Sequence, residues 1–111
     1  MNKSLNKLSP KDQIDWTARF IIVHSIIYYE MNYNVITDKM YDEYAKHLAK
    51  LIKLNQDIIK DCYYEYVIYD FDGSTGFDLR GRLKEEDNKY LTHLATKVMQ
   101  DGKKIKEKGR K

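Results

Sequence analysis

Two stretches of helical apolar spacing, joined by a short polar turn, constrain the fold of this chain most. In residues 14–29 apolar side chains recur every three or four positions along one face. Residues 41–52 repeat this spacing on a cleaner face, made of Tyr41, Tyr44, Ala45, Leu48, Leu51 and Ile52. Between them, Asn32-Tyr33-Asn34 supplies residues that tolerate turn geometry. The pattern predicts an antiparallel helical hairpin.

Capping signals place the starts of both helices. Ser9 is a good N-cap, Pro10 suits the first helical position, and Asp12 follows three residues after the cap. We therefore expect the first helix to run from Pro10 to about Met31. Thr37 or Asp38 can cap the second helix.

The second half of the chain has a weaker pattern. Residues 56–69 combine helical spacing with strand-forming side chains, which predicts a short helix followed by a short extended segment near residues 63–70. Residues 70–78 contain two glycines and three aspartates and predict a loop. A last helix is expected from about Lys84, with Gly102 ending it after Asp101.

The expected fold is therefore mainly α: a small helical domain built on the hairpin. Its 111 residues suit one domain, which we place at 1–102, followed by a basic tail at 103–111. Hydrophobic residues make up 42% and charged residues 33%, as in soluble globular proteins. The longest apolar run, 20–23, is too short to cross a bilayer, so no membrane association is expected. The single cysteine, Cys62, excludes an internal disulfide and indicates a reducing, cytoplasmic location.

The formal net charge is +3, and much of this excess lies in the tail 103–111. The rest of the chain is nearly neutral, so a general nucleic-acid surface is not implied. The tail is expected to contact nucleic acid only weakly, through electrostatic attraction to phosphates that is independent of base sequence.

Tyrosines and aspartates gather where the two helices of the hairpin should meet. Tyr28 and Tyr29 close the first helix, and Asp38, Tyr41 and Asp42 open the second. In an antiparallel hairpin these ends lie side by side. The faces of tyrosine rings attract a flat cationic ring, and carboxylates accept strong hydrogen bonds from carboxamides or sugar hydroxyls. The pattern predicts a clamp for a flat, polar ligand.

Over residues 14–54 the chain resembles the small N-terminal domain, domain Ia, of bacterial NAD-dependent DNA ligases. The ligase pattern runs Tyr-[Tyr/His], a loop, then Ile-x-Asp-x-x-Tyr-Asp, and the matching positions are Tyr28, Tyr29, Ile36, Asp38, Tyr41 and Asp42. That domain holds the nicotinamide mononucleotide (NMN) half of NAD, so the resemblance implies NAD or NMN as ligand. It also implies that Tyr28 and Tyr41 sandwich the nicotinamide ring. Tyr29 would take the place often held by histidine or tyrosine, and the two aspartates would hold the polar edges.

The resemblance implies a non-catalytic module rather than an enzyme, because the adenylating lysine and the other ligase domains have no counterpart in this sequence. Small stand-alone relatives of this kind resemble phage proteins. An alternative stays open: a phage-encoded protein-interaction or inhibitor module that keeps the hairpin and binds a host protein. A homodimer also stays open, because so small an amphipathic hairpin could bury its surplus tyrosines against a second copy.

Two further readings concern residues 66–74. The segment is similar to the first motif of haloacid-dehalogenase-type phosphatases, in which Asp70 would be the nucleophile and Asp72 the acid/base, but that fold needs a parallel sheet. It is also similar to the Lys-x-Asp-Gly adenylation motif of ligases, except that Asp70 stands where the lysine belongs. A structural loop, with aspartates capping turns and glycines allowing positive φ, is the expected outcome.

The histidines add little chemistry. His24 lies among apolar neighbours on the first helix, which favours a hydrogen-bonded packing residue over a catalyst. It lies one turn from Tyr28, so it could also border the ligand. His47 and His93 have no partners at metal-ligand spacing. We expect no catalytic residue and no metal site.

Overall fold

The computed structural model describes residues 7–74 and 76–108, the last three by their backbone alone. No strand occurs among these residues, which confirms the expected mainly α class. The elements in chain order are α1 (Pro10–Glu30), α2 (Asp38–Leu54), η2 (Ile59–Asp61), α3 (Glu65–Ile68), η3 (Arg80–Arg82) and α4 (Glu85–Lys108).

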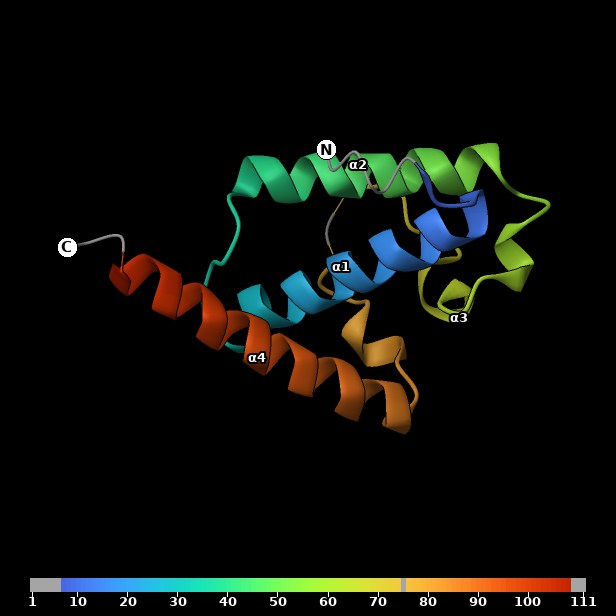
Figure 1. The fold of residues 1–111 in the computed structure, drawn as a ribbon. Coiled ribbons are helices and arrows are strands. Elements are labelled where there is room, and N and C mark those ends of the chain that lie inside the picture. Colours follow the sequence, from blue (N-terminus) through green and yellow to red (C-terminus); the bar gives the residue numbers. More distant parts are fainter. Residues whose placement is uncertain (1–6, 75, 109–111) are drawn as a thin grey trace.

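Helix α1 lies at the centre of the fold. Figure 1 shows α2 and α4 on either side of it, with α2 running antiparallel to α1 and α4 running in roughly the same direction as α1. Both neighbours cover α1, and five of its apolar side chains are fully buried in the core: Ile14, Ala18, Ile21, Ile22 and Ile26. The predicted hairpin is confirmed, and α4 completes the burial of its first helix.

The predicted caps form as the sequence indicates. The Ser9 hydroxyl accepts a hydrogen bond from the Asp12 amide at 3.2 Å. The Thr37 hydroxyl accepts one from the Met40 amide at 3.1 Å and identifies Thr37 as the N-cap of α2. Just beyond α1, Asn32 has a φ of 52°, the left-handed geometry that asparagine tolerates after a helix. Ser9 thus caps the start of α1, while Asn32 and Thr37 lie in the turn that connects α1 to α2.

The prediction of an extended segment near residues 63–70 is wrong. This part of the chain forms turns and the short helix α3, in which the Tyr64 carbonyl accepts hydrogen bonds from the amides of Val67 and Ile68. Val67 and Ile68 are both fully buried. Adjacent side chains point to opposite faces of a strand, whereas a helical turn directs both of these toward one core.

Gly102 does not end the last helix, which continues to Lys108. The glycine instead allows α4 to approach the turn between α1 and α2, because an added Cβ would lie 3.1 Å from Val35 Cγ1. Lys103 then reaches over the ring of Tyr33, with its ammonium 5.0 Å from the ring centre. Residues 103–108 of the expected tail are thus helical, and 109–111 lie outside the described residues.

The predicted loop over residues 70–78 is confirmed for its described part. Gly73 has a φ of 87°, and Asp72 caps a turn by accepting a hydrogen bond from the Ser74 amide at 3.0 Å. Asp70 forms an ion pair with Arg82 at 2.5 Å, which holds the pKa of its carboxyl below the usual range. With no parallel sheet in the described chain, the phosphatase reading of Asp70 and Asp72 is wrong.

Within the described residues, none of the helices has the length and apolar character needed to cross a membrane.

Candidate functional site

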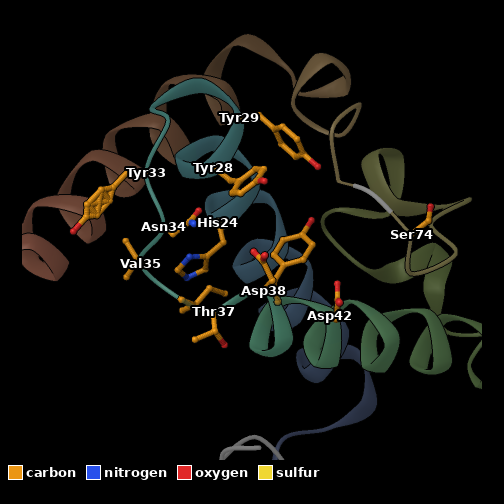
Figure 2. Close-up of a pocket in the computed structure, with 12 residues that line it drawn as sticks. His24, Tyr28, Tyr29, Tyr33, Asn34, Val35, Thr37, Asp38, Asp42 and Ser74 are labelled. Carbon is orange, nitrogen blue, oxygen red and sulfur yellow. The ribbon is translucent and has the colours of Figure 1, made fainter.

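A cavity of about 330 Å³ lies where α1 ends and α2 begins. Its wall includes all the residues that the sequence singled out as a clamp, namely Tyr28, Tyr29, Asp38, Tyr41 and Asp42. In Figure 2, Tyr28 and His24 from α1 and Asp38 from α2 lie close together around this space, whereas Tyr33 lies apart from them. The structure thus brings the five predicted residues to one place, and their binding of a ligand stays a prediction.

Tyr28 and Tyr29 present exposed rings at the rim of the cavity. Their side chains are 48% and 41% exposed. The two rings meet edge-on with centres 4.8 Å apart, and Tyr29 meets Phe77 in the same way at 5.1 Å. These edge-on contacts hold the rings in an aromatic row, defined here as Tyr28, Tyr29 and Phe77, while leaving ring surface available.

Tyr41 is the most firmly held of the clamp residues. Its hydroxyl lies 2.8 Å from the hydroxyl of Ser25, which itself donates to the Ile21 carbonyl at 2.7 Å, so Tyr41 donates to Ser25. The Gly76 amide adds a backbone hydrogen bond to the Tyr41 oxygen, and burial raises the pKa of this phenol. The Tyr41 hydroxyl therefore joins α1, α2 and the 70–78 loop, and its ring is the part left to face a ligand.

Gly76 makes this junction possible, because a Cβ added there would lie 2.2 Å from Ser25 Oγ and 2.3 Å from Tyr41 Oη. We expect Gly76→Ala to lower the free energy of unfolding by about 1–3 kcal/mol, the usual cost of overpacking, and to displace Tyr41. Urea denaturation measures this effect. Gly81→Ala is the matched control, since an added Cβ meets nothing within 4 Å there. Equal stability of the two variants would contradict this account of the junction.

The electrostatic character of the cavity is negative. Asp38 and Asp42 are both exposed at its wall. His24 is buried against Phe20, with ring centres 4.4 Å apart, and burial lowers its pKa to about 4, which leaves the imidazole neutral at pH 7. None of the described residues lining the cavity is lysine or arginine. Such a site favours a cationic or neutral ring over an anionic one.

Sequence reasoning missed the residues that hold the clamp together. The sequence pattern predicts no hydrogen-bonding role for Ser25 and predicts for Gly76 only that it allows a turn. The wall also includes residues of the connecting turn and one from the 70–78 loop: Asn34, Val35, Thr37 and Ser74. Spacing along one helix cannot reveal a contact made by a loop fifty residues later, so no signal in the sequence pointed to Gly76 or Ser74.

Comparisons with protein-family models, with curated proteins and with solved structures gave no match to this chain.

Proposed function

We propose that this protein is a non-catalytic module that binds the nicotinamide end of NMN or NAD. The observation that carries the proposal is the gathering of Tyr28, Tyr41, Asp38 and Asp42 around one cavity of about 330 Å³. That volume lies at the lower end of the range for small-molecule sites, as suits one mononucleotide or one half of a dinucleotide.

The chemistry of the ligand matches that of the wall. The nicotinamide ring of NMN and NAD is flat and positively charged, so tyrosine faces attract it by stacking and cation–π contact. The exposed carboxylates of Asp38 and Asp42 are placed to accept hydrogen bonds from the carboxamide or the ribose hydroxyls. The neutral state of His24 avoids placing a second positive charge against the ring.

The phosphate of NMN finds no cation among the described residues of the wall. In the proposed pose it lies toward solvent, where water solvates it, and the ring and ribose supply the affinity. If the ligand is passed on to a nucleotidyl-transfer reaction, a catalytic site outside these residues carries out that chemistry. In this proposal the protein acts in the cytoplasm, where nicotinamide nucleotides occur.

Calorimetric titration of the purified protein with NMN and with NAD tests the proposal. Saturable binding of one molecule per chain is the expected result. The absence of a saturable heat with either ligand would contradict it.

The aromatic row favours a second function, that of a protein-interaction or inhibitor module acting on a host protein. Phe77 is 64% exposed and extends the rings of Tyr29 and Tyr28 beyond the cavity. Exposed aromatic side chains gathered on one surface are characteristic of the energetic centres of protein interfaces.

The Phe77→Ala variant separates the two functions. Phe77 does not line the cavity, so we expect this variant to bind NMN within about twofold of the wild-type protein, a difference below 0.5 kcal/mol. If the row is instead a protein interface, the same variant loses a partner that the wild-type protein retains in a pull-down from bacterial lysate. A large loss of NMN affinity in Phe77→Ala would contradict the proposed position of the ligand.

A further inference from the structure

A second, larger hollow lies beside the N-terminal half of α1, whereas the proposed ligand cavity lies at the C-terminal end of this helix. It has a volume of about 610 Å³ and lies between the first half of α1, the segment before α3 and the start of α4. We call it the acidic groove. Its wall includes Trp16, Tyr63 and Tyr90 as aromatic residues and Asp12, Glu86 and Asp87 among its acids.

The groove carries an excess of negative charge. Four carboxylates line it, those of Asp12, Asp15, Glu86 and Asp87, against one guanidinium, that of Arg19. Asp15 already has an ion-pair partner in Lys11 at 3.8 Å. Among the described residues no ion pair is found for Asp12 or Glu86, and both are exposed. These two carboxylates are available to a cation from outside.

Part of this negative charge has a structural explanation, because acidic side chains in the first turn of a helix interact favourably with the helix dipole. This explanation does not account for the aromatic surface beside the acids. Tyr63 and Tyr90 are 60% and 54% exposed, and both line the same groove as Trp16. An aromatic surface next to unpaired carboxylates is a combination that binds organic cations through ring faces and charge together.

The aromatic surface is also held in place. Asp87 is only 7% exposed, and its two carboxylate oxygens accept hydrogen bonds from the hydroxyls of Tyr63, at 2.7 Å, and of Tyr66. The Tyr63 ring meets Tyr64 edge-on at 4.9 Å, and Trp16 stacks on Phe20 at 5.3 Å. Rings fixed in this way lose little conformational freedom on binding, which favours affinity.

From this combination we infer that the acidic groove docks a lysine- or arginine-containing segment of a partner protein. The basic side chains of the segment lie over the rings of Tyr63 and Tyr90, and their charges pair with Asp12 and Glu86. A nucleic acid is disfavoured, because its phosphates would face the carboxylates of the groove. This inference is independent of nicotinamide binding, which concerns the other cavity.

The fluorescence of Trp16, the only tryptophan in the chain, reports occupancy of the groove directly. The probe is a short peptide in which lysine alternates with glycine, titrated beside a peptide with glutamate in place of lysine. We expect a saturable change in Trp16 fluorescence with the lysine peptide, weaker at high salt, and none with the glutamate peptide. The same response to both peptides, or none to either, would overturn the inference.

Variants locate the contact. The double variant Asp12→Asn/Glu86→Gln is expected to bind the lysine peptide about tenfold more weakly than the wild-type protein. The Tyr90→Ala variant is expected to lose affinity by a similar factor. Glu43→Gln with Asp57→Asn changes the net charge equally at exposed positions outside the groove and is expected to leave binding unchanged. Circular dichroism checks that each variant folds. An equal loss of peptide affinity in the two double variants would mean that only the net charge matters, and it would overturn the inference.

A Trp16 signal that changes with protein concentration alone would assign the groove to a second copy of this chain and overturn the inference of a separate partner.

Discussion

The Tyr28→Ala variant is expected to bind NMN at least about fivefold more weakly than the wild-type protein. Stacking and cation–π contact together contribute about 1–3 kcal/mol at such a site, and tenfold in affinity corresponds to about 1.4 kcal/mol. Stability should change by less than about 0.5 kcal/mol, because Tyr28 is 48% exposed. Calorimetric titration measures the affinity, and urea denaturation measures the stability.

Tyr69→Ala is the matched control for this variant. Tyr69 is 55% exposed, lies outside the cavity and has the Arg82 guanidinium over its ring at 5.1 Å. The Tyr69→Ala variant should bind NMN with the same affinity as the wild-type protein. Full NMN affinity in Tyr28→Ala would contradict the proposed clamp. Tyr41→Ala is a less selective test, because the Tyr41 hydroxyl also joins Ser25 and the 70–78 loop.

Acidification is expected to destabilise the protein through His24. Burial lowers its pKa from 6.5 to about 4 in the folded state, so the unfolded chain takes up this proton first as the pH falls. The contribution of neutral His24 to stability is therefore fully present above pH 6.5 and is lost progressively as the pH falls toward 4. A shift of this size corresponds to about 3 kcal/mol over the whole range.

Urea denaturation at a series of pH values measures this dependence. Carboxylates also titrate in the lower part of the range, so the comparison that isolates His24 is with His24→Leu, which should lose less stability on acidification than the wild-type protein. His93→Leu removes an exposed histidine on α4 and should retain the wild-type dependence. Identical pH profiles for His24→Leu and the wild-type protein would refute the assignment to His24.

The hairpin and the approximate site could be predicted from the sequence because both depend on local signals. Apolar spacing set the buried faces, and Ser9 and Thr37 marked the helix starts that the structure shows. Once the two helices were antiparallel, the end of one had to meet the start of the other. Tyr28 and Asp38 therefore line one cavity.

The remaining features depend on contacts between segments far apart in the sequence. Strand-forming residues around Val67 adopt helix because burial in this core outweighs their propensity. Gly102 is a residue type that often ends a helix, yet here it lies within α4 and allows this helix to pack closely against Val35. The close contact of Gly76 with Ser25 and Tyr41 likewise exists only in the folded chain.

Calorimetric titrations with NMN and with nicotinic acid mononucleotide test whether the cavity binds the nicotinamide ring as proposed. The two ligands differ only in that a carboxylate replaces the carboxamide, which would place a negative charge in a cavity lined by Asp38 and Asp42. We expect saturable binding of NMN and at least about tenfold weaker binding of the acid, since like charges repel at a binding site. Absence of NMN binding, or equal affinity for the two ligands, would contradict the proposal.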